Sequence, residues 1–217
     1  MKKDNPVYVV IFTFIICILF VSGLALANDL TKDRVAANRR FAGQSAILTA
    51  LGLTYTDQAE AEKLFEATVS SIVDEAGNDL QPPAWRGTQE NRAVIISQFS
   101  GAGLWGSITI IVVADPDTAT IRGLRVIDQN ETPGLGGRIT EEWFQEQFRD
   151  QPTTNGRIAV SSGAEGSSTA QPSSVDGITG ATRTSDAMAD ITNGALDRIR
   201  AIADGSALTA SQNGSKQ

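Results

Sequence analysis

The sequence predicts an α+β protein, with an N-terminal transmembrane helix followed by one domain in which helices flank a mainly antiparallel sheet. Three observations support this fold class. No charged residue occurs between Asp4 and Asp29, β-branched runs separated by a turn fill the middle of the chain, and apolar residues recur every three or four positions near the C-terminus. This order of elements, with helices first, then strands, then a helix, is typical of an α+β domain.

The apolar run of residues 6–27 is long enough to cross a bilayer. A helix of this length reaches about 33 Å, compared with about 30 Å for the hydrocarbon core. A cleaved signal peptide is the alternative, because Lys2 and Lys3 precede the run and Ala25-Leu26-Ala27 fits a cleavage site. The run exceeds the usual apolar core of a signal peptide, about 15 residues, so we expect residues 1–28 to form a retained anchor. Basic residues lie on both sides of the run, and charge alone does not orient it.

The domain is expected to occupy residues 29–203. Helices are predicted at residues 31–50, 57–70 and 141–149, and strands at residues 93–96, 107–114, 121–127 and 156–160, with a hairpin turn at 115–117. The small, polar residues 161–174 are typical of a mobile surface loop. A last helix presents one apolar face, formed by Met188, Ile191, Ala195, Leu196 and Ile199, and its expected N-cap is Thr184 or Ser185. Residues 204–217 are expected to form a polar, disordered tail.

Composition narrows the chemistry that this chain can perform. It contains no His and one Cys, so it cannot build a Ser-His-Asp or Cys-His nucleophile, a His-ligated zinc or haem site, or a four-Cys iron–sulfur cluster. The carboxylates Glu141, Glu142 and Glu146 have the spacing of a solvated helix face. We therefore predict no catalytic residue and no metal ligand, and any redox chemistry must come from an organic cofactor. The net charge of −7 argues against nucleic acid as a partner.

The most informative stretch is Asp176-Gly177-Ile178-Thr179-Gly180-Ala181-Thr182, which sets small residues and hydroxyls beside the predicted start of the last helix. Unpaired N–H groups and the helix dipole attract anions at such a position, so a phosphorylated ligand could dock here. The stretch resembles the flavinylation signal of proteins that carry FMN through a phosphoester bond to threonine. In that resemblance the acceptor is Thr182.

A glycine-rich segment, Gly101-Ala102-Gly103-Leu104-Trp105-Gly106, formally satisfies the G-x-G-x-x-G pattern of dinucleotide sites. That pattern requires a helix directly after the glycines, whereas residues 107–114 are predicted to form a strand. We therefore expect no NAD site here. Two interpretations remain open from the residues alone: a plain glycine-rich hairpin, or an apolar wall formed by Leu104 and Trp105 beside a cofactor ring.

A second glycine-rich segment, Glu131-Thr132-Pro133-Gly134-Leu135-Gly136-Gly137, predicts a tight irregular loop after a strand. A plain turn is one interpretation. A cofactor pocket is the other, because Glu131 and Thr132 supply polar atoms, Leu135 supplies an apolar surface, and glycines let a flat ring approach the main chain.

Three segments, Gly103-Leu104-Trp105-Gly106 and residues 131–137 and 176–182, together resemble the C subunit of the sodium-translocating NADH:quinone reductase, with the related G subunit of the Rnf complex as the alternative. The resemblance spans residues 1–203 and implies an FMN-binding domain at residues 29–203 with FMN bound covalently to Thr182. The further cofactor-site residues that it implies are Leu104, Trp105, Glu131, Thr132, Gly134, Leu135, Gly136, Asp176, Thr179, Gly180, Ala181, Arg183, Thr184 and Ser185.

The resemblance also implies roles and partners. Asp176 and Thr179 would be recognised by a flavin transferase, Gly180 and Ala181 would leave the acceptor hydroxyl accessible, and Arg183 would offset the phosphodiester charge. The protein would relay electrons between other subunits of a membrane redox complex, with its domain on the periplasmic side of the cytoplasmic membrane, while NADH oxidation and sodium passage occur elsewhere in the complex. A free-standing extracytoplasmic flavin carrier and a non-redox anchored binding module remain alternatives.

Overall fold

The computed structural model describes residues 6–161 and 172–206. The chain divides into two compact units, Met1–Ala42 and Gly43–Gln217. Helix α1 runs without interruption from Pro6 to Ala50, and its apolar stretch, with a mean hydropathy of 2.9, is long enough to cross a membrane. The sequence-based boundary at residue 28 marks the end of the apolar run, whereas the second compact unit begins at Gly43.

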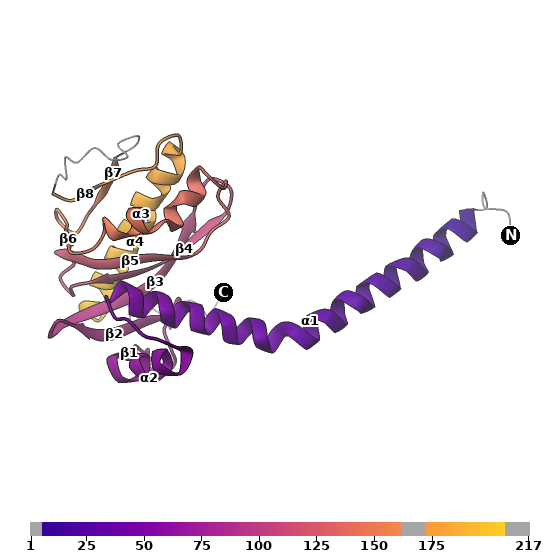
Figure 1. Cartoon of the computed structure of the whole chain (residues 1–217), viewed down its shortest axis with the longest axis horizontal. Coiled ribbons are helices and arrows are strands. Elements are labelled where there is room, and N and C mark those ends of the chain that lie inside the picture. The colour runs from indigo at the N-terminus through magenta and orange to yellow at the C-terminus, as the bar shows by residue number, and fades with distance from the viewer. Residues whose placement is uncertain (1–5, 162–171, 207–217) are drawn as a thin grey trace. The chain divides into compact units, whose positions relative to one another are not determined.

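A six-stranded antiparallel sheet forms the centre of the second unit (Figure 1). Its strands lie side by side in chain order: β1 (Val69–Ser71), β2 (Ala84–Gln89), β3 (Arg92–Ala102), β4 (Ser107–Ala114), β5 (Thr120–Asp128) and β6 (Gln151–Pro152). The hairpin of β4 and β5 confirms the predicted turn at residues 115–117. The α+β fold with a mainly antiparallel sheet is therefore confirmed, although three of these strands, β1, β2 and β6, were not predicted.

Successive residues of a strand point to opposite faces of the sheet, so the sheet contributes to two cores. Helices cover both faces. One core joins Val94, Ile96, Ile111 and Val113 to the end of α1 (Ile47, Ala50) and to Phe65 of α2 (Gln58–Thr68). The other joins Ile95, Ile110 and Val112 to the apolar face of α4 (Thr182–Ala203), which packs on β3 and β4. This second core contains Met188, Ile191, Ala195, Leu196 and Ile199, and the predicted apolar face of the last helix is confirmed.

The segment between β5 and α4 departs from the predicted elements. It contains a 3-10 helix, η1 (Gly136–Thr140), and a short helix α3 (Glu142–Glu146) where a helix of residues 141–149 was predicted. The predicted helix is too long because the chain turns after Glu146, with Phe148 N–H donating to Gln145 O and Arg149 N–H donating to Glu146 O. Strand β7 (Ala159–Ser161) pairs in parallel with β8 (Ser174–Asp176). Most of the predicted mobile loop and of the tail lies outside the described residues.

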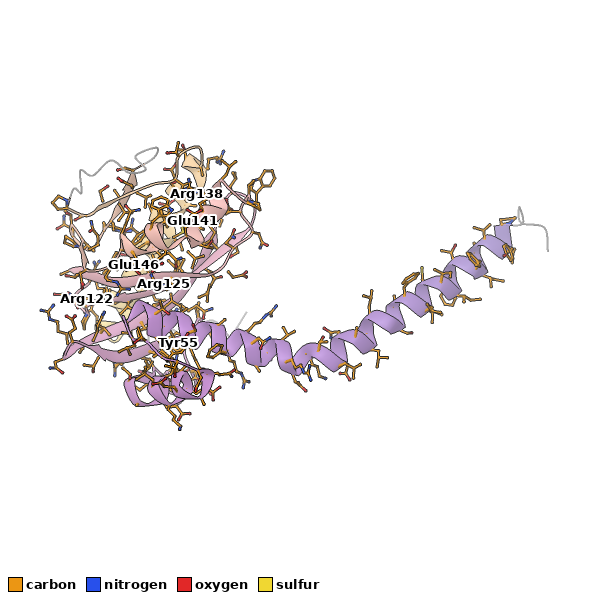
Figure 2. The ribbon with its side chains drawn as sticks, in the orientation of Figure 1. Tyr55, Arg122, Arg125, Arg138, Glu141 and Glu146 are labelled. Carbon is orange, nitrogen blue, oxygen red and sulfur yellow. The ribbon has the colours of Figure 1, made fainter. Side chains whose placement is uncertain are left out.

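Glu146 was predicted to lie on a solvated helix face. In the structure it instead forms ion pairs with Arg125 and Arg149 (Figure 2). Its carboxylate accepts hydrogen bonds from Arg149 Nε, at 2.6 Å, and from Arg125. Arg149 also donates to the carbonyl of Thr49 at 3.3 Å, near the C-terminal end of α1. The Glu146 carboxylate therefore ties α3 to β5, and through Arg149 to the end of α1.

This ion pair predicts an acid-dependent loss of stability. Hydrogen bonds from Arg149, together with Arg125, lower the pKa of Glu146 from 4.5 to about 2. Because the pKa is lower in the folded than in the unfolded state, the stabilisation is complete above about pH 5 and is lost as the pH falls toward about 2. In urea titrations of the full chain in detergent, the difference in free energy of unfolding between wild type and Glu146→Gln should shrink over this window. Glu75→Gln, at an exposed turn, is the control, and a difference that stays constant with pH contradicts the assignment.

Candidate functional site

Thr182 is the first residue of α4, and its side chain is exposed. The N-cap prediction is wrong, because the helix begins before both Thr184 and Ser185, whose side chains are buried. The residue at the N-cap position is Ala181, and an alanine methyl group cannot accept a hydrogen bond from the first turn. The helix therefore begins with an exposed threonine, and the side chain at position 181 does not cap the N–H groups of the first turn. Free N–H groups at a helix start attract a phosphate.

Ser185 holds the turn in front of α4. Its Oγ accepts a hydrogen bond from Ile178 N–H at 3.0 Å and donates to Ala181 O at 3.1 Å. Gly180 has a φ of +79°, which favours glycine, and it lies at the exposed corner of the turn beside Thr179. The two small residues before Thr182 thus let the chain turn sharply, and Thr182 is left exposed to solvent.

Asp176 begins the motif at the end of β8, where the structure holds its main chain firmly. The Gln147 side chain accepts from Asp176 N–H at 2.8 Å and donates to Asp176 O at 3.1 Å. The following Gly177 donates its N–H to Ser161 O at 2.7 Å, and a Cβ at this residue would lie only 2.9 Å from Ser185 Oγ. The acceptor motif is therefore built from a strand end, a close glycine contact and a helix start.

The loop of residues 131–137 lies against the start of α4. Leu135 N–H and Gly137 N–H both donate to Thr132 O, at 3.1 and 3.0 Å, and Gly134 has a φ of +75°. A Cβ at Gly136 would lie 2.5 Å from Thr184 Oγ1, so the loop main chain lies closer to the Thr184 side chain than a larger residue at position 136 allows. Leu135 is exposed, and its Cδ2 would lie 3.5 Å from a Cβ at Gly180.

The loop of residues 103–106 joins β3 to β4 and is closed by a hydrogen bond of 2.7 Å from Gly103 N–H to Gly106 O. The strand predicted directly after these glycines is confirmed as β4, so this G-x-G-x-x-G match lacks the helix that a dinucleotide fingerprint requires. Trp105 is 71% exposed and Leu104 is 46% exposed. Isolated exposed apolar residues are common, but these two share one loop next to the acceptor helix.

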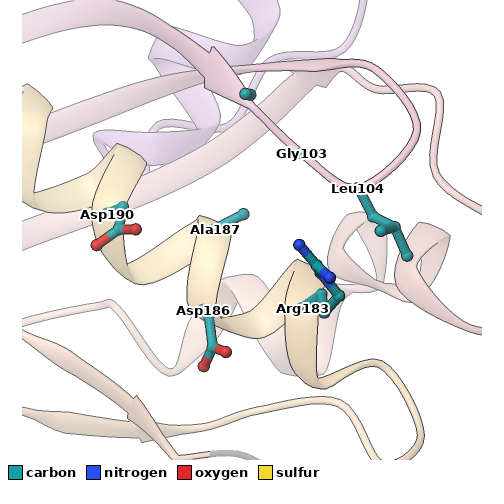
Figure 3. A pocket seen from close by; sticks show the side chains of 7 residues that line it. Gly103, Leu104, Arg183, Asp186, Ala187 and Asp190 are labelled. Atoms are coloured by element: carbon teal, nitrogen blue, oxygen red, sulfur yellow. The ribbon is translucent and has the colours of Figure 1, made fainter.

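An open cleft of about 440 Å³ lies between this loop and the first turns of α4 (Figure 3). Its lining residues are Ala102, Gly103, Leu104, Arg183, Asp186, Ala187 and Asp190. The volume falls within the range of about 300–1,000 Å³ that small-molecule sites occupy. Sequence reasoning identified Leu104 and Arg183 but missed Asp186 and Asp190. Both follow Thr182 at helical spacings of four and eight residues, and that spacing could have placed them on the same face.

The residues therefore fit a phosphorylated ring compound. The exposed hydroxyl of Thr182 and the N-terminus of α4 suit a phosphate, while exposed Leu104, Trp105 and Leu135 offer apolar surface to a ring. A close contact at Gly136 keeps the loop of residues 131–137 near the helix, and a close contact at Gly103 keeps the loop of residues 103–106 against Glu131. The structure brings all three sequence segments together, although they are separated by up to 79 positions in the chain, from residue 103 to residue 182.

Comparison with known proteins identifies the kind of domain. Residues 103–197 match the model of the FMN-binding domain, and this stretch contains residues 103–106, 131–137 and 176–182. A G subunit of an ion-translocating oxidoreductase complex from Methanosarcina acetivorans is 32% identical over 179 residues, which are 72% of this chain and 89% of that protein. A C subunit of a Na⁺-translocating NADH-quinone reductase from Haemophilus ducreyi is 34% identical over 93 residues, but the match covers only 42% of this chain and 36% of that subunit.

Two solved structures share the fold. The C subunit of a Na⁺-translocating NADH-quinone reductase from Parabacteroides distasonis aligns with a TM-score of 0.61 at 24% identity, covering 81% of this chain and 96% of that chain. The corresponding subunit from Shewanella oneidensis aligns with a TM-score of 0.65 at 18% identity, covering 80% of this chain and 99% of that chain. At these identities the two structures support the architecture and not the function.

Proposed function

Because the chain belongs to the family of FMN-binding-domain proteins that includes G subunits of ion-translocating oxidoreductase complexes and C subunits of Na⁺-translocating NADH-quinone reductases, we propose that it is a membrane-anchored electron-transfer subunit. It carries FMN covalently, through a phosphoester bond to Thr182. The observation that supports this proposal most strongly is the exposed hydroxyl at the first position of α4, next to the cleft between that helix and the loop of residues 103–106.

The side chains around the cleft divide the work of holding FMN. The N–H groups of the first turn of α4 and the guanidinium of Arg183 attract the phosphate, whereas Asp186 and Asp190, which also line the cleft, are acidic and do not bind it. Leu104, Trp105 and Leu135 exclude water from one surface of a ring. FMN supplies one-electron and two-electron redox chemistry when it is bound. The covalent bond keeps the flavin on the protein, and the apolar helix α1 keeps it beside the membrane.

The proposed setting is a membrane complex in which neighbouring subunits donate and accept the electrons. The domain lies on the periplasmic side, and a flavin transferase attaches the FMN. The extent of the matches favours a complex of the G-subunit type, because the match covers 89% of the Methanosarcina protein and 36% of the Haemophilus one. A sodium-translocating complex of the C-subunit type is the alternative, supported by the solved structures that share this fold.

The covalent flavin predicts a fluorescent band on a denaturing gel. The full chain, expressed with an active flavin transferase, should fluoresce under ultraviolet light after boiling in detergent, and the same chain from cells without the transferase should be dark. A dark band in both cases favours the non-redox binding module.

Co-purification separates the remaining alternatives. Detergent extracts of native membranes should yield the chain together with other redox subunits, whereas a free-standing flavin carrier would emerge alone and fluorescent. Sodium-dependent NADH:quinone reduction by the purified assembly would indicate the C-subunit type, and sodium-independent activity would count against it.

A further inference from the structure

One buried carboxylate connects the two glycine-rich loops of the site to the first turn of α4. Glu131 Oε1 accepts hydrogen bonds from the main-chain N–H groups of Leu104, at 2.8 Å, and Trp105, at 3.0 Å. Its other oxygen, Oε2, accepts from Thr184 Oγ1 at 2.6 Å. The residue is therefore bonded to a loop 27 positions before it and to a helix 53 positions after it.

The surroundings of this carboxylate are closely packed. Glu131 is 5% exposed and Thr184 is 1% exposed. A Cβ at Gly103 would lie 2.5 Å from Glu131 Oε1, and a Cβ at Gly136 would lie 2.8 Å from Glu131 Oε2. Both glycines thus let main chain rest directly on the carboxylate. A buried acidic side chain is costly unless it is hydrogen-bonded, and here its oxygens meet two N–H groups and a hydroxyl near the positive end of α4.

Glu131 was predicted to be among the residues that line the cofactor site. The contacts of Glu131 favour a different role. Its oxygens face the protein and not the solvent, because both are occupied by donors from the loop and the helix. The side chains of Leu104 and Trp105, in contrast, are exposed to solvent, while their N–H groups are hydrogen-bonded to the buried carboxylate of Glu131. Hydrogen bonds from two successive N–H groups to one carboxylate oxygen restrict the loop strongly, since bonds to a charged acceptor are the stronger ones.

We infer that Glu131 is a positioning residue of the flavin site: it holds the Leu104–Trp105 loop at a fixed place relative to Thr182 without touching the cofactor. The inference rests on the proposed function, because its consequence, a defined environment for the flavin ring, requires that FMN is bound. Attachment of FMN itself requires the Thr182 hydroxyl and not Glu131. Loss of the carboxylate should therefore leave the flavin attached but release the apolar wall beside it.

The test compares Glu131→Ala, Glu131→Gln and Thr184→Val in the full chain. In Glu131→Ala, hydrogen exchange at the Leu104 and Trp105 amides should accelerate by about tenfold or more, because two bonds to a charged acceptor are lost. The visible circular dichroism and the midpoint potential of the attached flavin should change, while intact mass shows that FMN is still present. Glu131→Gln should restore both signals toward wild type, since an amide oxygen can accept from the loop while the amide nitrogen donates to the Thr184 hydroxyl.

Asn193→Ala is the matched control. Asn193 lies on the same helix and bonds to the main chain of Ile158 through both side-chain atoms, outside the cleft. It should lower stability without changing the flavin signals. Thr184→Val removes one hydrogen bond only, with nearly unchanged volume, and should give a smaller change of the same kind if Glu131→Ala does not fold.

Three results would overturn the inference: wild-type exchange and dichroism in Glu131→Ala, the alanine phenotype in Glu131→Gln, or an equal flavin change in Asn193→Ala. The exchange measurement can also be made on the Thr182→Ala background, where no flavin is attached. A failure of the proposed function, seen as a wild-type chain without FMN, is therefore distinguishable from a failure of Glu131 to hold the loop.

Discussion

When the chain is expressed with an active flavin transferase, wild-type protein is expected to carry one FMN and the Thr182→Ala variant none. The hydroxyl at this position is exposed, and it lies at the start of a helix whose preceding residue, Ala181, offers no competing cap. Forming the phosphoester adds FMN less one water to the polypeptide mass. Intact mass spectrometry of the two proteins measures this increment directly, and we expect essentially complete loss in the variant.

Two further variants make this experiment specific. Thr182→Ser keeps a hydroxyl at the same position and should retain some FMN, whereas Ser107→Ala removes an exposed hydroxyl outside the three segments and should retain all of it. Trypsin cuts after Arg157 and Arg183, so Thr179 and Thr182 fall on one peptide and only fragmentation of that peptide separates them. Flavin found on Thr179, or a full FMN increment on Thr182→Ala, would show that the acceptor has been misassigned.

The sequence was informative about the site wherever a short motif carries the chemistry. Thr182 was predicted as the acceptor through the resemblance of residues 176–182 to a flavinylation signal, and the hydroxyls beside a helix start form a local pattern that suits a phosphate. The hydrogen-bond partners of the buried side chains could not be predicted from the sequence, because they depend on tertiary contacts. Thr184 and Ser185 are good N-cap residues by type, yet their hydroxyls bond to Glu131 and Ile178, and the helix starts before them. The role of Glu131 needs the loop at Leu104, which only the folded chain brings near.

The fold was predictable where hydrophobic pattern is strong and unpredictable where it is weak. Strand β4 is a continuous β-branched run, and the last helix has a clear apolar face. Strand β2 reads Ala-Trp-Arg-Gly-Thr-Gln, which lacks such a run, and its pairing with β3 determines its conformation. Strand β1 follows directly on α2, so its first two residues, Val69 and Ser70, were assigned to that helix. In these places long-range pairing overrides local propensity.

The second large effect is expected at Gly123, in the middle of β5 and opposite Val113 of β4. A Cβ at this position would lie 2.3 Å from the carbonyl oxygen of Ala50 and 3.0 Å from its carbonyl carbon. Both are main-chain atoms at the end of α1, where Ala50 belongs to a buried core, so no side-chain rotation can relieve the overlap. Gly123→Ala should therefore displace the last turn of α1 from the sheet and lower the free energy of unfolding by about 3 kcal/mol or more, at or above the upper end of the range for overpacked cores.

The same substitution at Gly43 should have the opposite sign. Gly43 lies within α1, and a Cβ there would meet nothing within 4 Å. Alanine restricts the unfolded chain and favours the helix, so Gly43→Ala should raise stability by about 1 kcal/mol. At Gly123 the restriction of the unfolded chain also favours alanine, by about 0.4–1 kcal/mol, but the overlap with Ala50 is the larger effect. Urea unfolding of both full-length variants in detergent, followed by tryptophan fluorescence, measures the two changes. Shifts of the same sign would mean that the end of α1 is not seated on β5 as the structure describes.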